Sequence, residues 1–362
     1  MAQFEGKTIL VTGACGTVGF ELIRQLLHDP KNNPAEVIGL DNQETALFFQ
    51  DQSYLQDSRA SFFIADIRDR DELARRMEGV NIVFHTAALK HVVLCERSPD
   101  QALNTNILGV QNIIATAQQA QVETVIFTSS DKAVNPTNVM GTSKLMGERL
   151  MTAANSTQRA GRGPVFASTR FGNVLGSSGS VIPIFHNQIY NGGPVTLTDS
   201  EMTRFIMSVE QSVSLVIDSA LEAQGGEVFI TKMPVVNIEN LADAMINKLS
   251  LRYGYPPSTL SKKIIGSKPG EKLYEELMSE EETRRAVELN NFFSVLPAFR
   301  GLYKEINYDY PSVVSKKVDD PYISNRQTPL TISETEEFLS QHNLLTTPDK
   351  DSTQRYWPGD KQ

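Results

Sequence analysis

The chain has 362 residues, of which 40% are hydrophobic and 21% charged, and its net charge at pH 7 is −9. This composition is ordinary for a globular protein with a sizeable core, and the negative charge argues against nucleic acid or an anionic membrane as the main partner. No apolar run is long enough to span a bilayer, and no signal peptide precedes the first predicted strand, so we expect a cytoplasmic protein. The two cysteines, Cys15 and Cys95, have neither metal-site nor disulfide spacing, and no metal site is expected.

Short apolar segments and amphipathic helices alternate along the first part of the chain. This alternation predicts an α/β fold of the Rossmann type: a doubly wound parallel sheet with helices on both faces. The predicted strands are residues 7–12, 36–40, 61–65, 81–84, 124–128, 165–170 and 227–231, and the predicted helices between them include 21–28 and 102–120.

The later chain lacks this alternation. Residues 176–199 are rich in Gly and Ser, and residues 241–345 are predicted to be mainly helix and loop. We therefore expect a smaller C-terminal lobe that closes over the carboxyl edge of the sheet. The predicted division is a Rossmann domain of residues 1–180 plus about 205–240, a lobe of about 181–204 plus 241–345, and a polar, mobile tail of 346–362.

The first strand runs into a turn that contains Gly13, Gly16 and Gly19. Glycines at these positions allow a tight turn, close approach of the backbone to a pyrophosphate, and close packing of the next helix, whose N-terminus then faces the phosphates. Asp41 ends the second strand, 22 residues after Gly19. A carboxylate there accepts hydrogen bonds from the ribose hydroxyls of a dinucleotide and repels a 2′-phosphate, so NAD is predicted over NADP. The alternative for Asp41 is a solvated turn residue.

The next two strand ends supply further candidate cofactor contacts. Asp66 and Ile67 follow the third strand, where Asp66 is placed to approach the adenine, although it also fits a helix N-cap. Ala87 and Ala88 follow the fourth strand and are small enough to let the cofactor's ribose approach, although they also fit ordinary packing.

The end of the fifth strand carries the most informative segment, residues 128–148. Ser130, Asp131 and Lys132 follow one another there, and Lys144 lies one helical turn after Met140. A short-chain dehydrogenase normally has the tyrosine of a Tyr-x-x-x-Lys pair at the Met140 position. An acid and a base added beside a redox site point to a dehydration combined with a redox step. The alternative is a local Asp–Lys surface pair.

These motifs, together with residues 85–91 (HTAALKH), 170–185 and 268–277, make the chain resemble an extended short-chain dehydrogenase/reductase. More narrowly, it resembles the bacterial nucleotide-activated N-acetylglucosamine 4,6-dehydratases of polysaccharide, capsule, flagellin and nonulosonic-acid pathways. The resemblance covers about residues 5–345. Ser130 stands where threonine is usual, and Met140 stands where many relatives have tyrosine, as in a Met-x-x-x-Lys subset of the family.

The resemblance implies a reaction: 4,6-dehydration of UDP- or GDP-N-acetylglucosamine to the 4-keto-6-deoxy sugar, with retention or inversion at C5. It makes Asp131 the acid and Lys132 the base of the elimination, and it makes Lys144 a ligand of the nicotinamide ribose. Ser130 is the nearest candidate to take the C4 hydroxyl proton, directly or through a water, and Met140 is expected to pack.

The residues expected to bind the nucleotide-diphosphate sugar lie mainly in the later chain. Asn173 and the turn at 176–179 offer donors to a diphosphate, and Arg204 offers a planar fork for its oxygens, although it also fits a surface ion pair. Glu271 is expected either to accept from the nucleoside ribose or to cap a helix that begins at Lys272. The predicted site residues are, for catalysis, Ser130, Asp131, Lys132 and Lys144; for the cofactor, Gly13, Gly16, Thr17, Val18, Gly19, Asp41, Asp66, Ile67, Ala87, Ala88 and Lys144; and for the substrate, Lys90, Asn173, Val181, Arg204 and Glu271.

Two other functions stay open at this point. A nucleotide-sugar 4-epimerase on the same fold would need a base for C4 but no acid–base pair for C6. A non-catalytic NAD-binding protein is suggested by the missing tyrosine. In each case a homodimer or higher homo-oligomer is expected, because relatives pair through the helices equivalent to residues 100–120 and 142–155.

Overall fold

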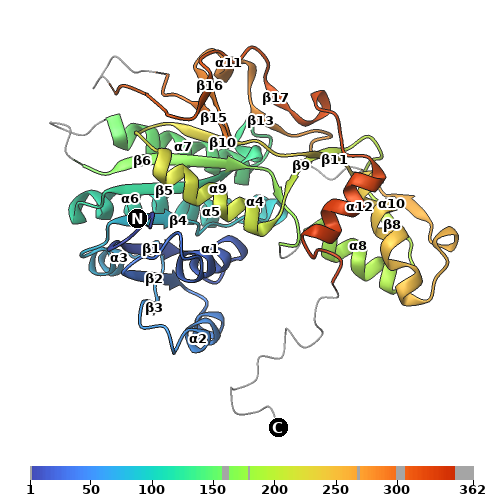
Figure 1. The fold of residues 1–362 in the computed structure, drawn as a ribbon, viewed down its shortest axis with the longest axis horizontal. Helices are drawn as coiled ribbons and strands as arrows, with labels where there is room; N and C mark the ends of the chain where they lie inside the picture. The colour runs from blue at the N-terminus through green and yellow to red at the C-terminus, as the bar shows by residue number, and fades with distance from the viewer. Residues whose placement is uncertain (1, 157–162, 178–179, 267–269, 299–305, 347–362) are drawn as a thin grey trace, which may run out of the picture. The chain divides into compact units, whose positions relative to one another are not determined.

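The chain folds into two compact units. The first unit holds Met1–Gly172, Val209–Lys232 and Glu276–Ile323, and the second holds Asn173–Ser208, Met233–Glu275 and Ser324–Gln362. The computed structural model describes residues 2–156, 163–177, 180–266, 270–298 and 306–346 (Figure 1). The predicted tail falls almost wholly outside these residues.

A ten-stranded sheet is the centre of the first unit, in the order β16-β14-β15-β10-β6-β5-β4-β1-β2-β3. The strands from β10 to β3 are parallel, and β15, β14 and β16 continue the sheet in antiparallel pairing. The strands are β1 Thr8–Thr12, β2 Glu36–Asp41, β3 Ala60–Ile64, β4 Ile82–His85, β5 Thr124–Ser130, β6 Val165–Phe171, β10 Val228–Thr231, β14 Ala286–Leu289, β15 Phe292–Val295 and β16 Val313–Ser315; a separate antiparallel pair joins β13 Glu276–Met278 to β17 Tyr322–Ile323.

Helices cover both faces of this sheet. Helices α3, α6 and α7 pack side by side, whereas α1 and α9 pack against each other and against strands of the sheet. The helices of the first unit are α1 Thr17–His28, α2 Glu44–Ser53, α3 Arg70–Arg76, α4 Val92–Arg97, α5 Pro99–Ala102, the π-helical η1 Leu103–Leu108, α6 Gly109–Ala120, the 3₁₀ turn η2 Asp131–Ala133, α7 Val139–Ser156, α9 Val209–Glu222 and α11 Glu280–Thr283.

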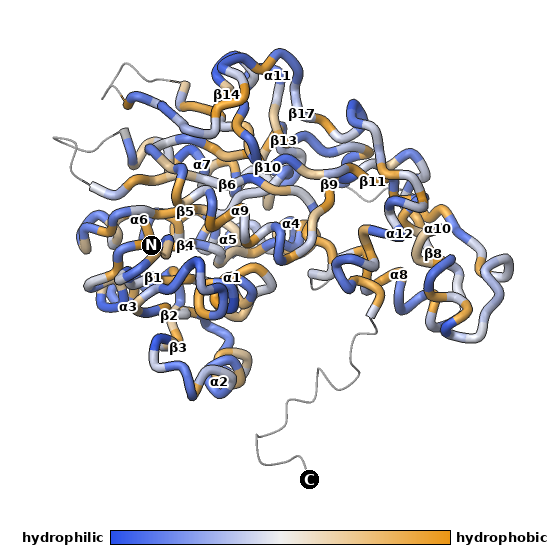
Figure 2. Tube along the Cα trace, in the orientation of Figure 1, coloured by the Kyte–Doolittle hydropathy of each residue, from blue (hydrophilic) through white to orange (hydrophobic). Residues whose placement is uncertain are grey.

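The parallel strands are buried on both faces, and this explains their continuous apolar sequences. Leu10 and Val125 lie in a core cluster with residues of α3, α6 and α7, while their neighbours Ile9 and Ile126 are equally buried. Because successive side chains of a strand point to opposite faces, both faces must be covered. Figure 2 shows hydrophobic residues along these strands. The predicted Rossmann-type fold is confirmed.

The second unit contains two small sheets and three main helices. Strand β9 lies between β7, which is parallel to it, and β11, which is antiparallel, while β8 pairs with β12. Residues of α8, α10 and α12 form one core, which includes Ile189, Leu241 and Leu339. The elements are β7 Asn173–Val174, α8 Val181–Tyr190, β8 Val195–Leu197, β9 Thr203–Met207, β11 Val235–Asn237, α10 Ile238–Leu249, η3 Leu251–Tyr253, η4 Pro257–Thr259, β12 Lys262–Ile264, η6 Ser324–Arg326 and α12 Ile332–Gln341.

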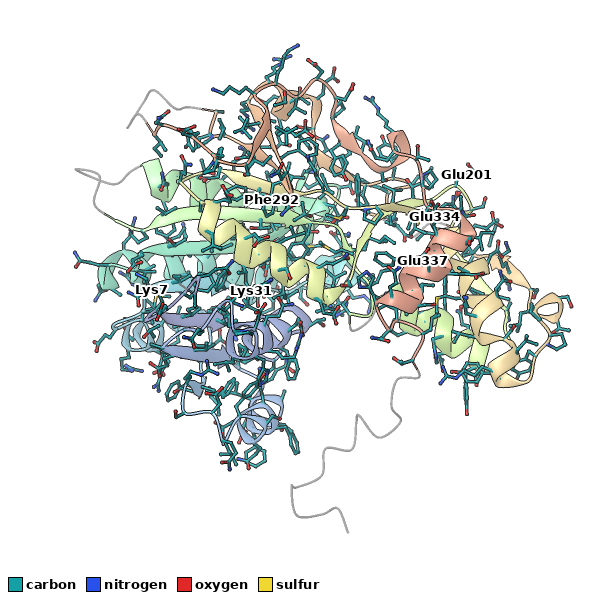
Figure 3. The ribbon with its side chains drawn as sticks, viewed as in Figure 1. Lys7, Lys31, Glu201, Phe292, Glu334 and Glu337 are labelled. Atoms are coloured by element: carbon teal, nitrogen blue, oxygen red, sulfur yellow. The ribbon has the colours of Figure 1, made fainter. Side chains whose placement is uncertain are left out.

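The later chain differs from its prediction in two respects. Residues 276–323 were expected in the lobe as helix and loop, but they belong to the first unit and supply strands β13–β17. The large sheet extends in antiparallel register past β10, and Phe292 of β15 packs its ring against Phe229 of β10 with centroids 5.4 Å apart (Figure 3). The boundary at 180 also moves to 172, because β7 pairs with β9 of the second unit.

Candidate active site

The glycine turn after β1 is sterically required. Gly13 has φ +71°, and a Cβ there would lie 2.8 Å from backbone atoms of Ala87. A Cβ on Gly19 would overlap the carbonyl oxygen of Gly13. Gly16 is the N-cap of α1 and has no side chain with which to cap it. The N-terminus of a twelve-residue helix therefore presents backbone N–H groups, as anion sites on Rossmann folds require.

A pocket of about 540 Å³ lies along the carboxyl ends of β1, β2, β3 and β4. Its lining includes most of the predicted cofactor residues, and also Lys90, which was predicted to bind the substrate. Thr17, Val18, Gly19 and Lys144 are not among the lining residues. The predicted residues that line it are Gly13, Gly16, Asp41, Asp66, Ile67, Ala87, Ala88 and Lys90.

Two carboxylates line this pocket at the ends of β2 and β3. Asp41 is buried; it accepts hydrogen bonds from the backbone N–H groups of Cys15 (2.9 Å) and Gln43 (3.0 Å), so it is not a solvated turn residue. Asp66 accepts from Nε (2.9 Å) and Nη2 (2.6 Å) of Arg68, and this pairing lowers the pKa of Asp66 to about 2. Asp66 does not cap a helix, because Asp69 is the N-cap of α3. The glycine turn after β1, together with Asp41 and Asp66, fits a bound dinucleotide.

Sequence reasoning missed part of this lining. Arg68, Asn42 and Gln101 all line the pocket, and Asn42 and Arg68 both donate to Asp66. The Asp-x-Arg spacing could have suggested the Asp66–Arg68 pair. Gln101 carries no such signal, because only the folded chain brings α5 beside the loop that follows β3, where Arg68 Nη1 donates to Gln101 over 3.3 Å.

The predicted catalytic turn forms at the end of β5. The Asp131 carboxylate is 1% exposed. Its Oδ1 accepts from Ser130 Oγ (2.6 Å), from the backbone N–H of Lys132 (2.9 Å) and from Lys132 Nζ (3.0 Å). The hydroxyl of Ser130 and the amino group of Lys132 thus meet at one oxygen atom of the Asp131 carboxylate. This arrangement can pass a proton among all three groups.

Lys144 is buried on α7 beside this strand. Its Nζ donates to the carbonyl of Thr128 (2.9 Å) and lies 4.7 Å from the ring centre of Phe127. Burial lowers the pKa of Lys144 to about 8, and the nearby Glu148 carboxylate and Cys95 thiol act in the opposite direction. Lys144 therefore loses its charge at a lower pH than an exposed lysine does.

Met140 packs, as predicted. It lies in an apolar cluster with Cys95 and Ala102. The next residue, Gly141, has no room for a side chain, because a Cβ there would overlap the carbonyl oxygen of Lys132. The start of α7 is consequently seated directly on the catalytic turn.

The predicted substrate residues of the second unit have defined contacts within that unit. Arg204 is buried, so it is not in a surface ion pair; it donates to the carbonyls of Thr203 (2.8 Å) and Lys272 (2.8 Å). Glu271 lies 3.9 Å from Arg204, and no helix begins at Lys272 in the described segment 270–275, so Glu271 does not cap one. Asn173 donates to the carbonyl of Phe205 (3.3 Å). Val181 begins α8, and positions 178–179 of the predicted turn lie outside the described residues.

Comparison with known proteins identifies the family. The family model described as polysaccharide biosynthesis protein matches residues 9–297. The chain belongs to this polysaccharide biosynthesis family. The chain is 35% identical to a UDP-N-acetylglucosamine 4,6-dehydratase (inverting) from Campylobacter jejuni over 338 residues, covering 92% of this chain and 97% of that one. It is also 36% identical to a UDP-glucose 4-epimerase from Rickettsia rickettsii, covering 93% and 96%.

Solved structures support the predicted short-chain dehydrogenase/reductase fold. Pen from Bacillus thuringiensis matches with a TM-score of 0.84 and 36% identity, covering 93% of this chain and 98% of that one. DesIV, a dTDP-glucose 4,6-dehydratase from Streptomyces venezuelae with NAD bound, matches with a TM-score of 0.64 and 25% identity, covering 74% and 86%. The predicted family is confirmed. Among the described residues, no helix has the length and apolarity that a membrane span needs.

Proposed function

We propose that this protein is an NAD-dependent nucleotide-sugar 4,6-dehydratase that acts on UDP- or GDP-N-acetylglucosamine. The observation that carries the proposal is the hydrogen-bonded set of Ser130, Asp131 and Lys132 at the carboxyl edge of the sheet, the edge along which the dinucleotide-type pocket also opens. A 4,6-dehydratase needs an acid and a base beside its redox site. The dehydratase among the relatives supports the same reaction class.

The cofactor residues have distinct roles in this proposal. Gly13, Gly16 and the first turn of α1, with Thr17, Val18 and Gly19, would hold the pyrophosphate of NAD, and Asp41 and Asp66 would hold the adenosine end. NAD held by these residues would supply the redox chemistry, which is hydride transfer from sugar C4 and back to C6. Lys144 would donate to the nicotinamide ribose.

The catalytic turn can complete the proton transfers without outside groups. The C4 hydroxyl proton passes through Ser130 Oγ to Asp131, along the 2.6 Å hydrogen bond. Neutral Lys132 takes the C5 proton, and protonated Asp131 gives its proton to the C6 oxygen, which leaves as water. Lys132 then returns a proton to C5. Asp131 and Lys132 end in their starting states, so protons balance over the cycle.

A panel of substrates tests the proposal. The protein is incubated with UDP-N-acetylglucosamine, GDP-N-acetylglucosamine and UDP-glucose, and the absorbance of the products in alkali is followed. We expect an absorbing 4-keto-6-deoxy product from one of the N-acetylglucosamine nucleotides. The second candidate, 4-epimerase, is favoured by the relatives of that name and would give a 4-epimer with no such absorbance. No change in any sugar nucleotide would indicate a non-catalytic NAD-binding protein.

Because the proposed cycle leaves NAD unchanged, the cofactor is expected to stay bound through purification. Heat-denatured protein should release NAD, measured by chromatography against NAD and NADP standards. Asp41 is the physical reason for NAD, because its carboxylate repels a 2′-phosphate. Release of NADP in place of NAD would contradict this assignment.

We expect a homo-oligomer built on a dimer. Large apolar side chains are exposed on the two predicted pairing segments: Leu103 and Leu108 on η1 are 48% and 43% exposed, and Met146 on α7 is 46% exposed. A four-helix contact would bury them in an isologous interface. Sedimentation at micromolar concentration should give at least a dimer. Met146→Glu should shift the equilibrium toward monomer, and a wild-type monomer would refute the prediction.

A further inference from the structure

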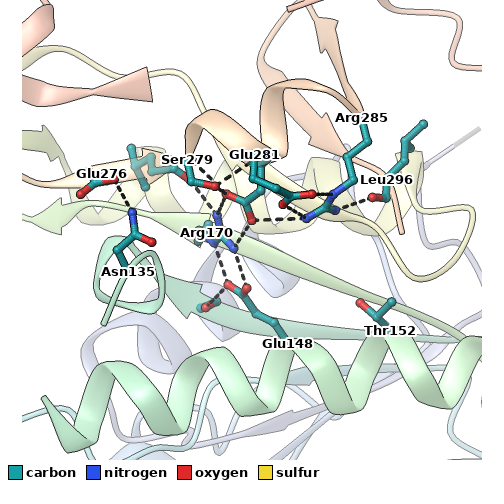
Figure 4. A network of polar contacts seen from close by, with 12 residues as sticks. Asn135, Glu148, Thr152, Arg170, Glu276, Ser279, Glu281, Arg285 and Leu296 are labelled. Atoms are coloured by element: carbon teal, nitrogen blue, oxygen red, sulfur yellow. Dashed lines mark hydrogen bonds and ion pairs between the residues drawn. The ribbon is translucent and has the colours of Figure 1, made fainter. Parts of the chain in front are cut away.

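A buried ionic cluster lies beside the catalytic turn and has no assigned role. Arg170 of β6 is 1% exposed and binds two carboxylates (Figure 4). It donates to Glu148 of α7 through Nε (2.8 Å) and Nη2 (2.7 Å), and to Glu282 of α11 through Nη2 (2.9 Å) and Nη1 (3.1 Å). We call Glu148, Arg170 and Glu282 the clamp. A buried cluster of one cation and two anions is a weak source of net stability, so its presence suggests another use.

The clamp joins the segments that surround the catalytic turn. Ser129 immediately precedes Ser130, and its Oγ donates to Glu148 Oε1 over 2.5 Å. On the other side, Arg170 Nη1 donates to the carbonyl of Leu277 (2.8 Å) in β13, a strand that packs against η2. Asn135 also donates to Glu276 (2.8 Å). The turn of residues 130–132 is therefore held between α7 and β13, with Arg170 bonded to both.

Close packing makes α7 sensitive to this bonding. A Cβ on Gly141 would overlap the carbonyl oxygen of Lys132, and a Cβ on Gly147 would lie 2.7 Å from the ring of Phe127. Helix α7 thus packs in close contact with η2 at Gly141 and with β5 at Gly147, where no side chain larger than hydrogen fits. A rigid element seated in this way transmits any displacement of Glu148 to Lys144, one turn earlier on the same face.

The clamp also places a negative charge near Lys144. The titratable groups that act on Lys144 are Glu148 on its own helix and Cys95 on α4, and Lys144 in turn acts on His85 of β4. Glu148 and Cys95 favour the charged ammonium, while burial opposes it. The pKa of His85 is lowered to about 3 by burial and by Lys144, so His85 is neutral near pH 7 and does not compete. Glu148 is the carboxylate among these groups.

We propose that the clamp is a positioning device for the proposed dehydration: Arg170 fixes the Ser130–Lys132 turn against α7 and β13, and Glu148 keeps Lys144 charged. The inference rests on the proposed function for its kinetic consequences, but its effect on Lys144 can be measured without any reaction. Glu148, Arg170 and Glu282 touch none of the reacting groups directly. They act through Ser129, Leu277 and Lys144.

Three matched Glu→Gln variants separate positioning from stability. Glu148→Gln removes the carboxylate next to Lys144, and Glu282→Gln removes the other arm of the clamp. Glu227→Gln is the control, because Glu227 is also a fully buried carboxylate of the first unit, but it bonds the turn at residues 224–225 and Tyr310. All three changes keep the side-chain shape.

The first readout is the titration of Lys144 by ¹³Cε-lysine NMR without substrate, with the signal assigned by its loss in Lys144→Met. We expect the titration at about pH 8 in the wild type to move down by about one unit or more in Glu148→Gln. The Lys144 titration should stay in place in Glu282→Gln and Glu227→Gln.

The second readout is kcat for dehydration. It should fall about 10–100-fold in Glu282→Gln with KM little changed, and it should stay near the wild-type value in Glu227→Gln.

The outcomes are separable. An unchanged Lys144 titration in Glu148→Gln, or an unchanged kcat in Glu282→Gln, overturns the clamp proposal. Equal losses of kcat in Glu282→Gln and Glu227→Gln would also overturn it, because a general loss of stability would then explain both. If the wild-type protein dehydrates no sugar nucleotide, the proposed function fails, and the NMR titration still decides whether Glu148 controls the charge of Lys144.

Discussion

Asp131→Asn and Lys132→Ala are each expected to slow dehydration by about 10²–10⁴-fold, the usual cost of losing one positioned proton-transfer group. Asparagine keeps the shape of Asp131 but cannot give a carboxylic proton to the leaving C6 hydroxyl. Alanine removes the amine that takes the C5 proton. Both variants should still bind NAD and sugar nucleotide, because the glycine turn and Asp41 are untouched. Product formation and release of NAD on denaturation measure the two properties separately.

A control for Lys132→Ala is present in the same unit. Lys232 has nearly the same side-chain exposure as Lys132, 28% against 27%, and it also pairs with a carboxylate, at 2.8 Å from Glu288. Lys232→Ala should therefore dehydrate at close to the wild-type rate. In Lys132→Ala, exchange of the C5 hydrogen with deuterated solvent should also slow. Wild-type rates in both Asp131→Asn and Lys132→Ala would mean that the turn is structural.

Arg170→Met is expected to destabilise the protein by about 3–5 kcal/mol, because it leaves Glu148 buried without its cation and leaves Glu282 with only Arg285, 3.9 Å away. Denaturant titration at fixed protein and NAD concentrations measures the loss. The triple variant Arg170→Met, Glu148→Leu, Glu282→Leu removes all three charges and should recover most of that stability. If the clamp positions the turn, the triple variant will be folded but slow. If Arg170→Met is as stable as the wild type, that result contradicts the buried ion pairs of Arg170 with Glu148 and Glu282.

The clamp also predicts that the folded protein loses stability in acid. Burial alone would raise the pKa of Glu282, but the charge and hydrogen bonds of Arg170 outweigh it and lower that pKa from 4.5 to about 2. A carboxyl whose pKa is lower in the folded state stabilises the fold above its unfolded pKa. That contribution should be lost as pH falls from about 4.5 to about 2. The triple variant should lack this component of the pH dependence.

The parallel half of the fold could be predicted from the sequence. Strands such as β5 are continuous apolar runs bounded by polar residues, and the observed Thr124–Ser130 extends the predicted 124–128 by two residues. The antiparallel half could not. Strands β14 and β15 have four residues each; β15 pairs with β10, whose partner residues lie 61 to 67 positions earlier in the chain, and β14 joins the sheet only through β15 and β16. No local periodicity reports such a partner.

The candidate site was predictable where its residues are neighbours in sequence. Ser130, Asp131 and Lys132 are consecutive, and Gly13 precedes a helix after a strand, so their spacing carries the signal. Arg170 entered the sequence analysis only as part of a family motif. Its role in the clamp could not be predicted, because its partners Glu148 and Glu282 lie 22 and 112 residues away. Arg204 shows the converse problem: its type suggested a phosphate ligand, and nothing in its spacing indicated that it would also donate to the backbone carbonyls of Thr203 and Lys272. A sequence gives residue type but not the partners that occupy a side chain.

The most direct test of the account is the reaction in deuterated water, followed by proton NMR with UDP- and GDP-N-acetylglucosamine as substrates. The proposed mechanism transfers the C4 hydrogen to C6 and takes the C5 hydrogen from solvent through Lys132. It therefore predicts a new methyl signal that is a singlet, because C5 carries deuterium, together with loss of the C4 proton signal. A 4-epimer with its C6 hydroxymethyl group intact, or unchanged substrate with both nucleotides, would contradict the account.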